Sequence, residues 1–395
     1  MTNQVNINEI QSYKRGYFKK MMVLGLPIII QNLVSTSLNM VDTIMISGQG
    51  EQSLAAVAFA NKFLFILFVI LFGIYSGTSI FISQFYGAGD HKRIHHVLGI
   101  GITLGIGVSS IFFLLAMFVP HMVMRVFIDS PEVIAYGSSY LRIVSLSYLP
   151  MGVTFALSNA SRNVHLTKIP MFSSIIALLL NTGINYLLIA GNLGFPELGV
   201  KGAAIATVIS RLVEFSILFS FIFIKKGNPL RASLHELFGF SKELFAKILK
   251  TIAPVIVNEG LWVVGTSVYY IAYGKLGEDS VAAMQVAMTL TDFCWAIFTG
   301  LGSAAAILVG NAVGNDENER ALSYAKITLR FGVVIAILIG GLMILLRPFL
   351  NILFPLEAET LEWAKASVLV MALYFPVRNF NYIMFISVLR SGGDT

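Results

Sequence analysis

KMMVLGLPIIIQNLVSTSLNMVDTIMISG, residues 20–48, is an apolar run of nearly thirty residues whose only charge after the first lysine is Asp42. About 20 such residues in a helix are enough to cross the ~30 Å hydrocarbon core of a bilayer. Lipid accepts a helix because a helix satisfies its own backbone hydrogen bonds. The stretch therefore predicts a transmembrane helix.

Polar side chains interrupt this apolar helix at Gln31, Asn32, Ser35, Asn39 and Asp42. A carboxylate inside a membrane helix normally faces a bundle interior or a wet cavity, where it marks the path of an ion or substrate. An interfacial position for Asp42 is the alternative, because ~31 Å of helix separates it from the inner end of the run.

The composition of the whole chain places it among membrane proteins. Of its 395 residues 56% are hydrophobic and 12% are charged, and the mean hydropathy is +0.79. A soluble domain carries about 25% charged residues. The single cysteine, Cys294, excludes an internal disulfide framework. These features predict an all-α polytopic membrane protein.

Apolar runs separated by Gly, Pro and charged clusters predict ten spans, at about 21–47, 54–85, 97–119, 134–161, 170–193, 199–224, 247–274, 281–311, 324–346 and 362–389. With the N-terminus inside, eighteen Lys and Arg lie in inner loops and five in outer loops. This bias predicts a cytoplasmic N-terminus in the cell membrane. The same distribution explains the net charge of +6, so we expect no nucleic-acid partner.

The two halves of the chain repeat at an offset of 227 residues. Matching pairs include Pro27 and Pro254, Ala56 and Ala283, Gly73 and Gly300, Gly87 and Gly314, and Arg93 and Arg320. Both halves begin on the same side, which indicates a parallel repeat of the kind some transporters use. We expect an N-terminal lobe at 1–224, a cytoplasmic amphipathic linker at 225–246 and a C-terminal lobe at 247–395.

The second half stops early in this comparison, because Thr395 matches Thr167 at an offset of 228 and the first half then continues for two more spans. We therefore expect six helices in the first lobe and four visible helices of six in the second. A chain truncated before its last two helices is the favoured explanation.

Six stretches together resemble the multidrug and toxic compound extrusion (MATE) family, namely LPIIIQNLVSTSLNMVDTIMIS (26–47), GTSIFISQFYGAGD (77–90), LNTGINYLLI (180–189), GVKGAAIATVISR (199–211), NEGLWVVG (258–265) and SVLRSGGDT (387–395). The resemblance implies two helical lobes around a central cavity. It also implies alternating access and antiport of organic cations against sodium ions or protons, with no cofactor.

The resemblance implies a coupling site at Asp42, Asn181, Asn185 and Thr207. Independently, Asn181 and Asn185 are one helical turn apart and share a face. One carboxylate with amide and hydroxyl oxygens could hold sodium at Asp42, Asn181 and Thr207, or Asp42 could carry a proton. The two asparagines could instead simply bridge helices. Some family members carry a second acid where this chain has Asn185.

A second group of residues is expected in the C-terminal lobe. The resemblance implies that an acid near Glu259, beside Trp262, binds substrate or ion, and other members carry a further acid at the position of Asn379. We assign Glu259, Trp262, Gln31 and Asn379 to substrate binding or charge compensation.

Further polar and special residues receive structural roles. Pro27 and Pro254 are predicted hinges, because each proline removes a hydrogen bond of its helix. We interpret the remaining charges of the spans as ion pairs or snorkelling side chains, at Asp292, Arg378, Arg142 and the Arg211–Glu214 pair.

No nucleotide-binding or hydrolase motif is present, so we expect a transporter driven by an ion gradient rather than an enzyme. The predicted protein is a monomer in the lipid bilayer that exports small organic cations. Two alternatives stay open: a flippase for lipid-linked sugars of the same superfamily, and a membrane partner protein that transports nothing.

Overall fold

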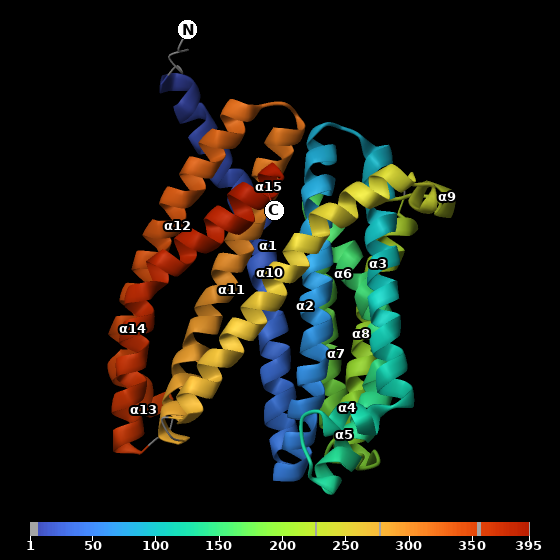
Figure 1. Cartoon of the computed structure of the whole chain (residues 1–395), viewed down its shortest axis with the longest axis vertical. Helices are drawn as coiled ribbons and strands as arrows, with labels where there is room; N and C mark the ends of the chain where they lie inside the picture. Colours follow the sequence, from blue (N-terminus) through green and yellow to red (C-terminus); the bar gives the residue numbers. More distant parts are fainter. Residues whose placement is uncertain (1–6, 226, 276–277, 354–356, 395) are drawn as a thin grey trace. The chain divides into compact units, whose positions relative to one another are not determined.

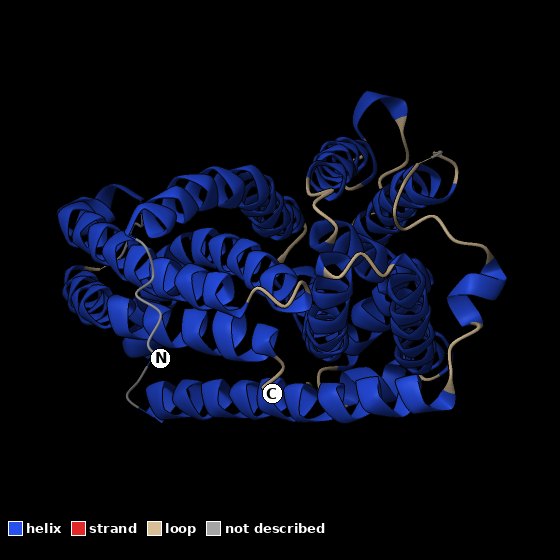
Figure 2. Cartoon of the chain, turned by 90° about the horizontal axis from the view of Figure 1, so that it is seen from above, coloured by secondary structure: helices blue, strands red, loops and turns tan. Residues whose placement is uncertain are grey.

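The computed structural model describes residues 7–225, 227–275, 278–353 and 357–394, and every regular element in these ranges is a helix (Figures 1 and 2). Ten helical segments of the described chain are long and apolar enough to cross a membrane, which confirms the predicted fold class. The longer helices are α1 (Ile7–Ser47), α2 (Glu51–Gly87), α3 (His91–Phe118), α5 (Pro131–Val144), α6 (Tyr148–Asn163), α7 (Lys168–Leu188), α8 (Val200–Phe223), α10 (Lys242–Lys275), α11 (Glu278–Gly314), α12 (Asn318–Leu346) and α14 (Ala358–Tyr382).

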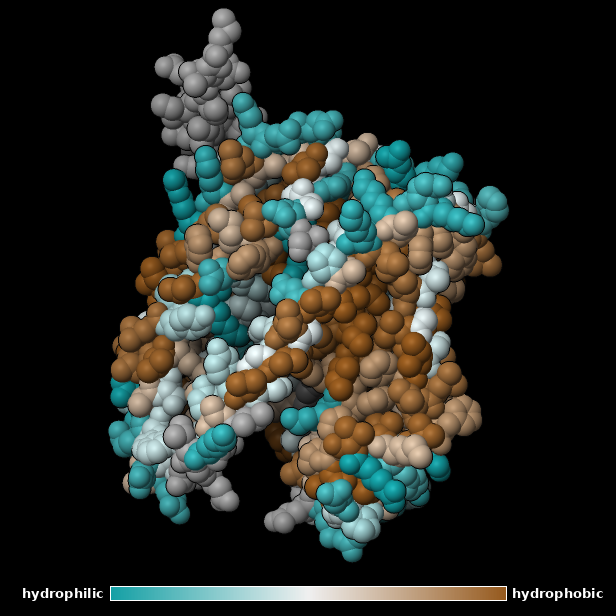
Figure 3. Space-filling view, in the orientation of Figure 1, coloured by the Kyte–Doolittle hydropathy of each residue, from teal (hydrophilic) through white to brown (hydrophobic). Residues whose placement is uncertain are grey.

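Shorter helices complete the chain between these long elements. They are α4 (Pro120–Arg125), α9 (Leu234–Phe238), α13 (Leu350–Leu353) and α15 (Arg390–Gly392), with 3₁₀ turns η1 (Ser145–Ser147), η2 (Asn192–Gly194) and η3 (Arg347–Phe349) and the π-helix η4 (Ile383–Leu389). In Figure 3, apolar side chains gather over the middle of α2, α3 and α10, whereas hydrophilic residues gather at the helix ends. This distribution is what a lipid-facing surface requires.

Two compact units divide the chain, and the division falls inside helices rather than in the linker. One unit is Val34–Val257, and the other combines the chain up to Leu33 with the chain from Asn258 onward. The first part of α1 therefore packs in one unit and its second part in the other. Helix α10 is divided in the same way: its residues up to Val257 belong to the unit Val34–Val257, and those from Asn258 onward belong to the other unit. The expected lobes, with their central cavity, stay a prediction.

The repeat is visible in the helix boundaries. Helix α2 begins at Glu51 and ends at Gly87, whereas α11 begins at Glu278 and ends at Gly314, so both ends differ by 227 residues. The turns that follow also match, because Gly89 and Asp316 both have a positive φ, of 71° and 58°. Similar boundaries at a constant offset support the repeat expected from the sequence.

In each unit, the helix segment that comes from the other half of the repeat packs closely against a glycine. A Cβ on Gly73 of α2 would lie 2.8 Å from the Ile256 side chain of α10. A Cβ on Gly300 of α11 would lie 2.9 Å from the backbone nitrogen of Ile29 in α1. Both members of these pairs are related by 227 residues. The glycines allow each first segment to approach its partner helix closely, as small residues do in membrane bundles.

Three regions differ in detail from the sequence expectation. The span expected at 134–161 is broken into α5 and α6 by the 3₁₀ turn η1. The last span ends in the π-helix η4, and such turns are frequent at functional sites. The linker contains one short helix, α9, capped by Ser233, and α10 already begins at Lys242.

Candidate functional site

The hairpin of α7 and α8 provides most of the polar residues of the candidate site in the unit Val34–Val257. Gly202 allows the close approach at its turn, because a Cβ there would lie 2.5 Å from the Leu188 carbonyl oxygen. Toward the end of the hairpin away from this turn, Ser174 Oγ donates a hydrogen bond to Glu214 Oε1 over 2.7 Å. The two helices are antiparallel and have the same rise, so this contact places Asn181 level with Thr207.

Asp42 of α1 is joined directly to α7. Asn185 Nδ2 donates to Asp42 Oδ1 over 2.5 Å and to Asn181 Oδ1 over 3.0 Å. Both asparagines are fully buried, with an exposed fraction of 0%. The structure thus brings together the three residues that the sequence assigned to a coupling site on two separate helices.

Thr207 and Tyr140 form the opposite side of the same polar cluster. The Thr207 hydroxyl donates to the Ala203 carbonyl over 3.0 Å and is also hydrogen-bonded to the hydroxyl of Tyr140, on α5. Tyr140 is buried and near enough to Asp42 to interact with its charge. Sequence reasoning missed Tyr140, and its only signal was its position directly after the small-residue stretch Gly137–Ser139.

Two buried amide atoms of the cluster have no hydrogen-bond partner within the described part of the chain, namely Asn181 Nδ2 and Asn185 Oδ1. A buried polar atom without a partner is costly unless a ligand or water satisfies it. Asn185 Oδ1, the Asp42 carboxylate and the Thr207 hydroxyl are hard oxygen donors, and these suit an alkali cation. Of the two amide oxygens, Asn185 Oδ1 is therefore the open one, because Asn181 Oδ1 already accepts a hydrogen bond.

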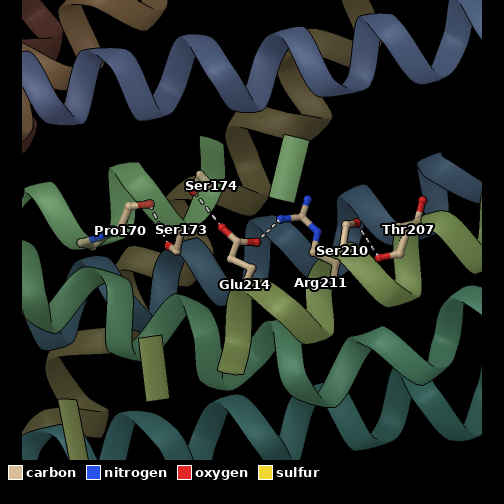
Figure 4. A network of polar contacts seen from close by, with 7 residues as sticks. All are labelled: Pro170, Ser173, Ser174, Thr207, Ser210, Arg211 and Glu214. Atoms are coloured by element: carbon tan, nitrogen blue, oxygen red, sulfur yellow. Dashed lines mark hydrogen bonds and ion pairs between the residues drawn. The ribbon is translucent and has the colours of Figure 1, made fainter. Parts of the chain in front are cut away.

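Arg211 and Glu214 continue the polar stripe of α8 beyond Thr207 (Figure 4). Arg211 Nη1 donates to Glu214 Oε2 over 2.9 Å, and the Glu214 side chain is only 6% exposed. Arg211 also lies near enough to Asp42 for the two charges to interact. The ion pair expected from the sequence is therefore present, and it adjoins the cluster around Asp42.

The other unit holds a different polar pair. Both Nη atoms of Arg390 lie 3.2 Å from Glu259 Oε1, joining the segment after η4 to α10. The two side chains are 7% and 17% exposed. Sequence reasoning counted Arg390 among the inner-loop charges, and its burial against Glu259 is a finding of the structure.

The remaining residues assigned to this unit are dispersed. Asn379 is fully buried and donates to the Gly332 carbonyl over 2.9 Å, which ties α14 to α12. Trp262 is 53% exposed, and Gln31 is buried, with 6% exposed. Pro27 lies inside α1, and Pro254, which belongs to the unit Val34–Val257, lies inside α10; both helices continue through their proline. No group of three or more His, Cys, Asp or Glu able to hold a metal occurs in the described ranges.

Ten apolar helices in a repeated arrangement, with carboxylates, amides and arginines inside the spans, define a polytopic membrane transporter. The family model MatE matches residues 27–187 and 254–395, and the chain belongs to this family. Its members are transporters, not enzymes, and need no cofactor.

Relatives and solved structures agree with this assignment. The chain is 28% identical over 357 residues to "Probable multidrug resistance protein NorM" of Neisseria meningitidis serogroup B, covering 89% of this chain and 77% of that protein. It is 26% identical over 375 residues to "Uncharacterized transporter YisQ" of Bacillus subtilis, covering 93% and 80%.

Two solved structures show the same fold. A transporter described as a MATE family member in an outward-facing conformation superposes with a TM-score of 0.85 at 20% identity, covering 95% of this chain and 83% of that one. A MATE protein "in the bent conformation" gives a TM-score of 0.86 at 20% identity, covering 98% and 85%.

Proposed function

We propose that this protein is a secondary active antiporter that exports organic, mostly cationic, compounds in exchange for protons or sodium ions by alternating access. One observation carries the proposal: the carboxylate of Asp42 is bonded to Asn185, and through it to Asn181, within membrane-spanning helices. An acid held by amides in a span is a site that a monovalent cation can enter and leave. The relatives named for multidrug resistance support the substrate class.

Asp42 is the residue that binds the coupling cation. For sodium, its carboxylate supplies the charge, and Asn185 Oδ1 and the Thr207 hydroxyl supply neutral oxygens. For a proton, the carboxylate itself is the acceptor, and Asn185 orients it. In both cases one positive charge neutralises one carboxylate, so a cationic substrate and the coupling cation can exclude each other.

Glu259 has a narrower role than the sequence expectation gave it. Its charge is already compensated by Arg390, so a cationic substrate reaching Glu259 would have to displace the guanidinium. The flippase alternative requires free cationic side chains for a pyrophosphate, whereas the partly buried Arg211 and the buried Arg390 both pair with carboxylates. Export of organic cations is therefore the better match.

The test is Asp42→Asn, which removes the charge but keeps a side chain that can accept the Asn185 hydrogen bond. We expect the variant to insert and fold, and to lose efflux of a fluorescent organic cation from proteoliposomes under an imposed proton or sodium gradient. Wild-type protein under each gradient separately is the control and identifies the coupling ion. Undiminished efflux by the variant would remove Asp42 from the mechanism.

A further inference from the structure

Glu214 is a second acid within a membrane span, and the proposed transport cycle does not use it. It lies in α8, and its side chain is 6% exposed. Each carboxylate oxygen has its own partner, with Ser174 at 2.7 Å and Arg211 at 2.9 Å. Taking a carboxylate and a guanidinium out of water is expensive, and hydrophobic residues often replace such pairs without loss of stability. Stability alone therefore does not explain why this ion pair is present.

Arg211 interacts with two carboxylates, those of Glu214 and Asp42. Thr207, Arg211 and Glu214 are spaced i, i+4 and i+7, so they share one face of α8. The Arg211 charge also acts on Asp42 and on the Tyr140 hydroxyl. In this structure the hydrogen bond of the guanidinium goes to Glu214, and Asp42 is within range of its charge.

A small cavity lies beside the Arg211 guanidinium. It is lined by Ser35 and Leu38 of α1 and by Ser174, Arg211 and Glu214 of the hairpin. The volume open to the centre of a water molecule is about 10 Å³, which is room for one water. Leu38, one of the lining residues, lies one helical turn before Asp42 in α1.

The charges around the cavity determine what Asp42 can bind. With Asp42, Arg211 and Glu214 all ionised, the group carries a net charge of −1, and one monovalent cation neutralises it. If Arg211 paired with Asp42 instead, that carboxylate would already be neutralised by the protein and would lose its attraction for a cation. The affinity of Asp42 for a cation therefore depends on which carboxylate Arg211 pairs with.

We propose that Glu214 is a positioning residue: it holds Arg211 in an ion pair, with Ser174 orienting its carboxylate, and so keeps Asp42 available to the coupling cation. This inference rests on the proposed function, because it presupposes that Asp42 is the coupling residue. It adds a specific task for an ion pair that the sequence had marked as structural.

The experiment compares Glu214→Gln with the double variant R211M/E214Q. In proteoliposomes loaded with ethidium, we measure the concentration of the driving cation that gives half-maximal efflux. Glu214→Gln frees Arg211 to neutralise Asp42, so this concentration should rise at least about tenfold, the effect of one close charge pair in a partly screened site. R211M/E214Q removes the competing charge and should return it to within about threefold of wild type. Ser216→Ala, on the exposed side of α8, is the matched control.

The outcomes separate the inference from the proposed function. A double variant that folds but stays as impaired as Glu214→Gln would overturn the positioning role, because loss of packing is not repaired by a second loss. Wild-type protein that ignores both gradients would instead overturn the antiport proposal. If Glu214→Gln does not insert, Ser174→Ala takes its place: it removes one Glu214 partner and should shift the same concentration in the same direction, by less.

Discussion

Glu259→Gln should destabilise the unit that contains residues from Asn258 onward, because it breaks a buried ion pair and leaves a charge behind. Both Nη atoms of Arg390 lie 3.2 Å from Glu259 Oε1, and the side chains of Arg390 and Glu259 are 7% and 17% exposed. Removing one partner of a buried pair costs about 3–5 kcal/mol. Because Glu259 keeps some exposure and glutamine can still accept a hydrogen bond, we expect the lower value, about 3 kcal/mol.

Thermal unfolding of the purified variant measures this cost. For a unit of this size, about 3 kcal/mol corresponds to a fall in Tm of ~6–12 °C. The double variant E259Q/R390M should recover most of the loss, because it leaves no unpaired charge. Ser267→Ala, on the exposed face of the same helix, is the control and should leave Tm unchanged. An unchanged Tm in Glu259→Gln, or a double variant less stable than either single one, would refute the reasoning.

Three further predictions concern other parts of the chain. Pro27→Ala restores a helix hydrogen bond in α1, so expression should stay near the wild-type level while gradient-driven efflux changes; wild-type turnover would remove Pro27 from the mechanism. Asn185→Asp adds a second acid beside Asp42 and should lower the sodium concentration for half-maximal efflux several-fold, measured in proteoliposomes. Gly99→Ala would push a Cβ into the Leu237 carbonyl of α9 and should lower Tm, whereas Gly107→Ala, with open space around it, should not.

Much of the fold could be predicted from the sequence because the physical constraints are strong. Lipid allows few charges in a span, so the apolar runs marked the ten helices. The repeat could be recognised in the sequence because close contacts between helices require glycine at equivalent positions of both halves, such as Gly73 and Gly300. The contact of Asp42 with Asn185 followed from a resemblance to a family and from the shared helical face of two asparagines.

Other features depend on tertiary contacts that no spacing encodes. Tyr140 reaches Thr207 only because α5 packs beside α8, and a tyrosine in a span more often packs in the core. Arg390 was assigned to a loop because basic residues near a helix end normally face the cytoplasm. Arg390 lies in α15, the helical turn that directly follows the π-helix η4, so the helical backbone continues beyond the end expected at 389. A π-helix leaves no mark in the hydropathy pattern.

The two copies of the repeat differ in their polar residues, which separates the roles of the two acids. At an offset of 227, Asp42 corresponds to Tyr269, which is 61% exposed, so only one copy has an acid at this position. In the same register Glu259 corresponds to Asn32, whose amide donates to Thr299 over 3.0 Å. Asp42 accepts a hydrogen bond from the neutral amide of Asn185, and the nearby Arg211 is paired with Glu214, whereas Glu259 is neutralised by Arg390. A cation entering from solution therefore gains more at Asp42. Loss of gradient dependence should accompany Asp42→Asn and not Glu259→Gln, provided that both proteins are compared below the lower Tm.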